Sequence, residues 1–97
     1  MAGAPDRIEI VRHGGFAGIS RRAAVDLAAA PDDERDAALA ALGELRRAAG
    51  APPGPERDAF IYTVAVTEGD RREELTVPEH AVPEAARAFL DRVLSSS

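Results

Sequence analysis

The sequence predicts an α+β fold with the element order β-β-α-β-β-α, in which a four-stranded antiparallel sheet carries two helices packed on one face. Two observations lead to this fold class. Two pairs of strand-like segments are each joined through a glycine-containing turn, and a segment with apolar residues at helical spacing follows each pair. A helix with one apolar stripe must bury that stripe against another layer, so both helices are expected to cover the same face of the sheet.

The chain has 97 residues, of which 45% are hydrophobic and 30% charged. This composition is typical of a globular protein, and the length leaves no room for a second core. We therefore expect a single domain over residues 1–97. Residues 1–6 and 95–97 are rich in small and polar residues and are expected to be flexible.

The first predicted hairpin begins with residues 7–12, where charged and β-branched residues alternate in the period-two pattern of a half-buried strand. Gly14 and Gly15 follow, and this pair favours a tight turn because glycine adopts positive φ angles at little cost. Residues 19–26 are expected to return as the second strand, although their alanines have weak β-propensity.

The clearest helix is predicted over residues 31–49. Pro31 suits a first helical turn, and the acids that follow it complement the positive end of the helix dipole. Gly50 favours a helix end, and the proline-rich residues 51–57 are expected to form a surface connection. The predicted apolar stripe of this helix contains Ala38, Leu39, Leu42, Leu45 and Ala49.

The second hairpin is predicted from residues 60–66, the strongest strand pattern in the chain, and residues 71–77, with a turn at residues 68–70. Pro78 ends the returning strand because it lacks a backbone donor. A second helix is expected to begin near Pro83. Its predicted apolar stripe contains Ala86, Phe89, Leu90, Val93 and Leu94.

Charge and composition argue against several classes of function. A net charge of −5 is the opposite of the basic surplus with which nucleic-acid-binding proteins displace counterions, so no nucleic-acid partner is expected. No apolar run is long enough to span a membrane, and no leader pattern precedes the first strand. A cytoplasmic location is therefore expected, with export by a route that uses no signal peptide left open.

No catalytic residue, metal site or cofactor is predicted. The acids at residues 32–36 suit a helix N-terminus, and Glu73 and Glu74 must point to opposite faces of their strand. Ser20 lacks the second glycine of a nucleophile elbow. The chain has no cysteine, and His13 and His80 lie far apart in sequence. We therefore expect a protein that is not an enzyme.

One segment stands out as a candidate binding site. A glycine-rich turn places two bulky apolar residues, Phe16 and Ile19, where polar residues are normally preferred. Phe16 can either fold back onto the core or serve as an apolar anchor that enters a groove of another protein. The candidate residues are His13, Gly14, Gly15, Phe16, Ala17, Gly18 and Ile19.

The assembled chain resembles the emfourin family of small bacterial inhibitors of protealysin-like metalloproteases. Three stretches carry the resemblance: residues 8–18, with the core Gly-Gly-Phe-Ala-Gly, residues 58–64, and the closing residues 83–94. His13 departs from the small residue that family members tend to carry before the glycines, and its role stays open.

The resemblance implies reversible inhibition of a thermolysin-type zinc protease, whose cleft would be blocked by the glycine-rich hairpin, with the free inhibitor expected to be a monomer. Such proteases favour a bulky apolar side chain beside the scissile bond, which Phe16 or Ile19 would supply. Whether the Gly69-Asp70 turn or the Pro52–Pro55 loop also contacts the target stays open. The alternative is a protein–protein interaction module that does not inhibit.

Overall fold

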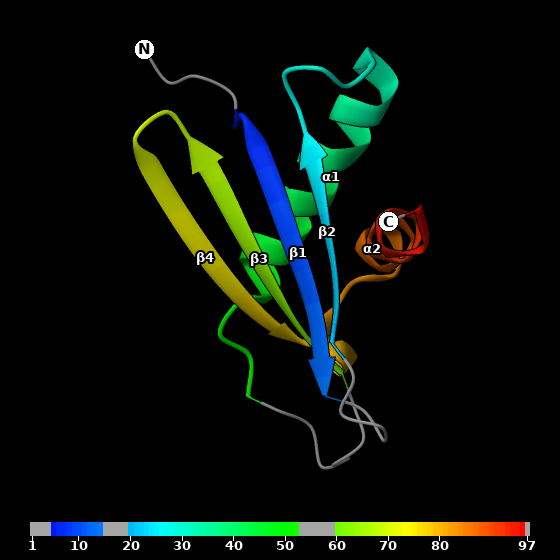
Figure 1. Cartoon of the computed structure of the whole chain (residues 1–97). Coiled ribbons are helices and arrows are strands. Elements are labelled where there is room, and N and C mark those ends of the chain that lie inside the picture. The colour runs from blue at the N-terminus through cyan, green and yellow to red at the C-terminus, as the bar shows by residue number, and fades with distance from the viewer. Residues whose placement is uncertain (1–4, 15–19, 53–59, 97) are drawn as a thin grey trace.

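The structure is a computed structural model that describes residues 5–14, 20–52 and 60–96. It confirms the predicted order of strands and helices and adds one short 3-10 helix (Figure 1). The elements are β1 (Arg7–Gly14), β2 (Arg21–Asp26), α1 (Asp32–Ala48), β3 (Phe60–Glu68), β4 (Arg71–Pro78), η1 (Glu79–Ala81) and α2 (Glu84–Ser96).

The four strands form one sheet in the order β2-β1-β3-β4, and every neighbouring pair is antiparallel. The two predicted hairpins are therefore present, as β1 with β2 and β3 with β4. The sequence did not predict which strand of the first hairpin would pair with which strand of the second. The first strand pairs with the third along its whole length, so the chain crosses behind β1 through α1 before it re-enters the sheet as β3 (Figure 1).

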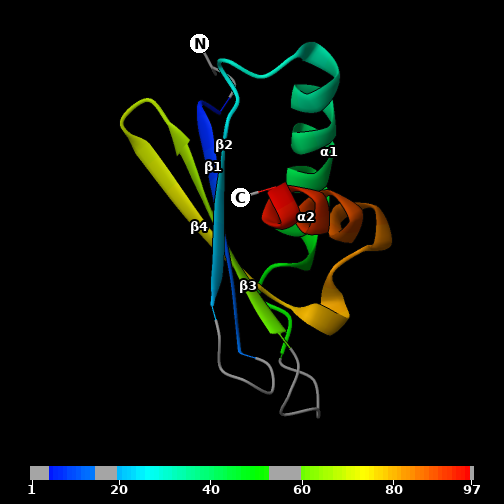
Figure 2. The ribbon, with the colours of Figure 1, turned by 45° about the vertical axis from the view of Figure 1, so that its right-hand side comes forward.

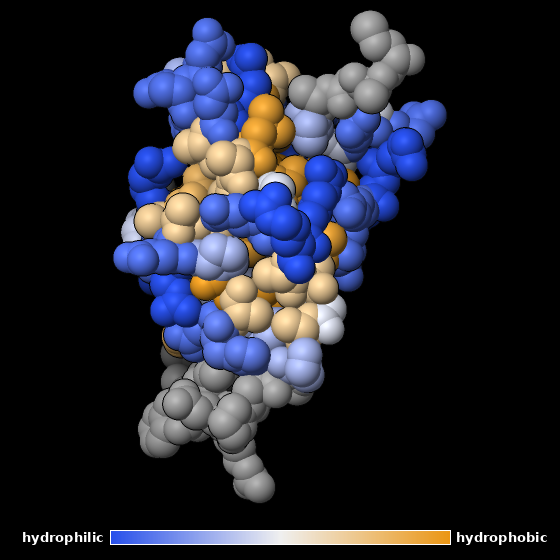
Figure 3. Space-filling model, turned by 180° about the vertical axis from the view of Figure 1, so that it is seen from behind, coloured by the Kyte–Doolittle hydropathy of each residue, from blue (hydrophilic) through white to orange (hydrophobic). Residues whose placement is uncertain are grey.

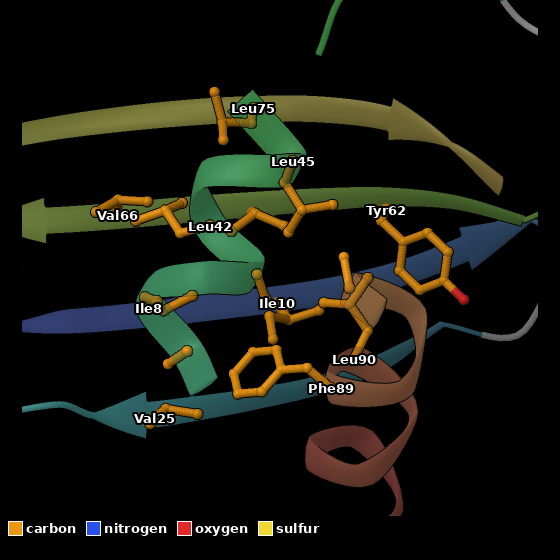
Figure 4. Close-up of a cluster of buried hydrophobic side chains, with 14 of the residues drawn as sticks. Ile8, Ile10, Val25, Leu42, Leu45, Tyr62, Val66, Leu75, Phe89 and Leu90 are labelled. Atoms are coloured by element: carbon orange, nitrogen blue, oxygen red, sulfur yellow. The ribbon is translucent and has the colours of Figure 1, made fainter. Parts of the chain in front are cut away.

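Both helices cover one face of the sheet, as the two apolar stripes predicted, and no described element covers the opposite face (Figure 2). The core lies between the sheet and the helices (Figure 4). Its fully buried side chains include Ile8, Ile10 and Val64 from the sheet and Leu42, Leu45, Leu90 and Leu94 from the helices. Burial of each such side chain stabilises the fold by about 1.5–3 kcal/mol.

The element bounds differ from the prediction at several places: β2 begins at Arg21 and not at residue 19, and β3 continues to Glu68, beyond its predicted end at residue 66. β1 continues two residues beyond the predicted end at Arg12, because His13 and Gly14 find backbone partners in Ile61 and Phe60 of the distant third strand. The helical turn η1 between β4 and α2 was not predicted. α1 begins and ends within one residue of the predicted bounds.

The outer surface on the helix side mixes charged side chains with small apolar ones (Figure 3). α2 ends beside β2, the edge strand at one side of the sheet (Figures 1 and 2). Arg92 and Val93 of α2 line a groove together with Ala23 and Val25 of β2.

Candidate functional site

The register of the sheet brings the borders of the candidate segment to one end of the molecule. Gly14, the last residue before residues 15–19, is the register partner of Phe60, the first described residue after residues 53–59. β2 begins at Arg21 and β4 ends at Pro78 at this same end. We call it the loop end of the sheet, because both of these segments leave the described structure there.

The structure describes two of the seven candidate residues, His13 and Gly14. Gly15, Phe16, Ala17, Gly18 and Ile19 lie outside the described residues. Gly14 has a φ of 93°, a left-handed conformation that glycine adopts far more readily than other residues. The chain therefore enters the segment 15–19 through a backbone conformation that requires glycine.

His13 lies on the open face of the sheet, where its side chain is half-buried. Its Nε2 is 3.3 Å from Oγ1 of Thr63 on β3. The contact joins the two central strands immediately before Gly14. It gives His13 a structural partner within the sheet.

Arg12 extends the helix-facing side of β1 to the loop end. Its Cζ lies 4.5 Å from the centroid of the Phe60 ring, and its Nη1 is 4.0 Å from Oδ1 of Asp91 on α2. The backbone N–H of Phe60 in turn donates a hydrogen bond to Oε1 of Glu79, at 2.9 Å. Cation–π and charge-assisted contacts thus connect β1, β3, η1 and α2 at the loop end.

Tyr62 lies beneath this cluster and is 2% exposed. Figure 4 shows its ring at the edge of the core near the tip of β1. Burial raises the pKa of Tyr62 above its usual value of 10.0, while a hydrogen bond and the positive charge of Arg12 act in the opposite direction. The neutral phenol is therefore the form that the folded state favours.

Two further segments were left open as possible contacts. Pro52 lies near η1, since its carbonyl oxygen is 2.8 Å from Nε2 of His80, and η1 follows β4 at the loop end. The rest of the Pro52–Pro55 loop lies outside the described residues. The Gly69-Asp70 turn lies at the opposite end of the nine-residue strand β3, about 27 Å away at the usual rise per residue. The turn and the loop end therefore lie at opposite ends of the sheet.

Several charged groups away from the loop end have ion-pair partners among the described residues. In the described part of the chain no group of three or more His, Asp or Glu residues could hold a metal ion. Glu73 pairs with Arg46 and Glu74 with Arg72, on opposite faces of β4, as the strand period predicted. No described helix has the length and apolar character that crossing a membrane requires.

Sequence reasoning missed Arg12, Glu79 and Asp91 as parts of this end. A signal for Arg12 was present, because it continues the side of the strand that Ile8 and Ile10 bury. A charged residue in that position needs a partner. Glu79 and Asp91 come from distant elements, and no local pattern marks them.

Comparison with known protein families gives one match, the emfourin family, over residues 10–94. No curated protein and no solved structure matches the chain. The matched range runs from the middle of β1 to the last turn of α2 and includes the whole candidate segment. With nearly its entire length matched, this chain belongs to the emfourin family, a family of protease inhibitors and not of enzymes.

Proposed function

We propose that this protein reversibly inhibits a protealysin-like, thermolysin-type zinc metalloprotease by placing residues 13–19 in the substrate cleft. The observation that carries the proposal is the emfourin match over residues 10–94, a range that includes the glycine-rich segment. The inhibitor supplies no chemistry of its own. It occupies the space in which a substrate peptide would lie.

The loop end supports this role because the residues that flank the segment 15–19 belong to hydrogen-bonded strands of the sheet. The segment 15–19 leaves the central strand β1, which has a hydrogen-bonded neighbour on each side, and the chain then continues into β2, which is hydrogen-bonded to β1. Arg12, Phe60 and Glu79 tie β1 and β3 to one another and to η1. A segment held on an ordered platform loses less conformational entropy on binding, and so binds more tightly than a free peptide of the same sequence.

The proposed anchor is Phe16, with Ile19 as a second apolar residue. A thermolysin-type cleft accepts a bulky apolar side chain beside the scissile bond. Peptide cleavage requires the zinc-bound water to approach the carbonyl carbon in a near-attack geometry. A backbone held by the sheet at both ends can bind in the cleft without reaching that geometry, which makes it an inhibitor and a poor substrate.

The test is the inhibition constant of a Phe16→Ala variant against a protealysin-like protease. The constant is measured from the rate at which the protease hydrolyses a fluorogenic peptide. Loss of a central aromatic anchor is expected to raise the constant by about thirtyfold or more. The matched control is Asp70→Ala, at the exposed turn on the opposite end of the sheet, which is expected to leave it unchanged.

Two outcomes would contradict the proposal. An unchanged constant for Phe16→Ala would remove this residue from the contact. A wild-type protein that binds the protease without slowing hydrolysis would be a non-inhibitory interaction module.

A further inference from the structure

The open face of the sheet is divided into two halves of different character. Its side chains form rows across the strands, set by the register. The rows nearest the loop end contain neither carboxylate nor guanidinium on β1, β3 and β4. We call these side chains the Val11 patch, and its members are Val11, His13, Ile61, Thr63 and Thr76.

The rows farther from the loop end are charged. Glu9 is 3.9 Å from Nε of Arg7 and 3.9 Å from Nη1 of Arg72, and Nη2 of Arg72 is 3.8 Å from Glu74. Such a network is typical of a sheet face exposed to water. Asp26 of β2 lies in the same row as Arg7.

The Val11 patch does not follow this pattern. Val11 and Ile61 are aliphatic, and both are only half-buried. The register places them on the face of the sheet opposite to the two described helices, which Figure 2 shows on the other side. The polar groups of His13 and Thr63 contact each other at 3.3 Å. A partner that covers them would leave this contact intact. These are the properties of the centre of a protein interface.

The patch is continuous with the proposed inhibitory segment. His13 directly precedes Gly14 on β1, and Ile61 directly follows Phe60 on β3. The patch therefore borders the point where residues 15–19 leave β1. Three strands and two rows of side chains cover roughly 200 Å² at usual sheet spacings. A stable protein complex buries about 800 Å² on each partner, which five residues of a loop do not supply.

We propose that the Val11 patch docks on an uncharged surface of the protease that adjoins its substrate cleft, with His13 at the boundary between the two contacts, so that the inhibitor is held by its sheet face as well as by the segment 15–19. The inference rests on the proposed function and adds a second contact to the same interface. Arg22, which is the register partner of Val11 on β2, lies at the border of this contact.

The test uses the same substitution at two positions of one strand. Thr63→Glu places a carboxylate in the Val11 patch, whereas Thr67→Glu places it on the same face of β3 in the charged half. Thr67 is the register partner of both Arg7 and Arg72, which favour a carboxylate there. We expect the inhibition constant to rise about tenfold or more for Thr63→Glu, because the carboxylate replaces the hydroxyl that contacts His13 and its charge would have to be desolvated in the interface. The constant for Thr67→Glu is expected to stay within about twofold.

A second variant protects the test against loss of folding. Thr76 is exposed, so Thr76→Glu perturbs the free protein little and is also expected to raise the inhibition constant about tenfold. Thermal unfolding of each variant identifies any that does not fold, and Thr76→Glu decides the matter if Thr63→Glu is one of them.

The outcomes separate this inference from the proposed function. If wild type inhibits, Phe16→Ala weakens inhibition, and neither patch variant differs from Thr67→Glu, the docking role is wrong and the proposed function stands. If wild type inhibits no protealysin-like enzyme, both fail. If light scattering shows a wild-type dimer that Thr63→Glu dissociates without changing the inhibition constant, the patch binds a second copy and the docking role is overturned.

Discussion

The guanidinium of Arg12 on β1 lies over the ring of Phe60 on β3, with 4.5 Å between Cζ and the ring centroid. The two residues are not register partners, because Arg12 stands opposite Tyr62 and reaches diagonally toward the loop end. Phe60 borders the segment 53–59, and Arg12 lies two residues before Gly14. One contact therefore connects the borders of both segments that leave this end.

Removal of this contact is expected to weaken the fold. Arg12→Ala deletes the cation–π contact with Phe60 and the longer ion pair with Asp91, and should lower the free energy of unfolding by about 1–2 kcal/mol. Urea denaturation measures the change. Arg22→Ala, on the exposed face of the neighbouring strand, is the control and should stay within about 0.5 kcal/mol of wild type. If the two substitutions changed the free energy of unfolding equally, the contacts of Arg12 would not stabilise the fold.

Glycine-to-alanine substitutions at two positions are expected to act with opposite signs. Gly14 has a φ of 93°, so Gly14→Ala should destabilise the protein by about 1 kcal/mol or more. Gly43 lies within α1, and a Cβ there would meet no atom within 4 Å. Gly43→Ala should therefore stabilise the protein by about 0.5–1 kcal/mol. Urea denaturation of both variants checks the signs, and a stabilising Gly14→Ala would contradict the left-handed entry to the segment 15–19.

Stability at alkaline pH is expected to depend on Tyr62. Burial raises its pKa above 10.0, so the folded state keeps the phenol proton at pH values where the unfolded state has lost it. The resulting stability is fully present below the unfolded-state pKa of about 10 and is lost as pH rises through the folded-state pKa. The chain has one tyrosine, no cysteine and no lysine, so few other side chains titrate in this range.

The matched variant is Tyr62→Phe, measured by denaturation between about pH 8 and pH 11. Wild type should lose stability above about pH 10, and the variant should lose less over the same interval. Parallel pH profiles for the two proteins would place the titrating group elsewhere. A spectrophotometric titration of the folded protein reports the phenol pKa directly.

Several elements could be predicted because their signals are local. The acids after Pro31, the apolar residues Ala38, Leu42 and Leu45 at helical spacing, and Gly50 after them define α1 to within one residue. The strand pattern of residues 60–66 likewise predicts β3. The extension of β1 to Gly14 could not be predicted in this way, because its cause is pairing with residues almost fifty positions away.

The amino-acid order alone determined which segments are strands and helices, which side of each is apolar, and that two hairpins carry two helices, since these follow from residue spacing within a few turns of chain. Only the tertiary structure decided that β1 pairs with β3. Strands with similar apolar faces can pair in more than one order, and which pairing forms depends on how distant segments pack together. That pairing brings Arg12, Phe60, Glu79 and Asp91 together beside the glycine-rich segment, and it separates the Val11 patch from the charged half of the open face.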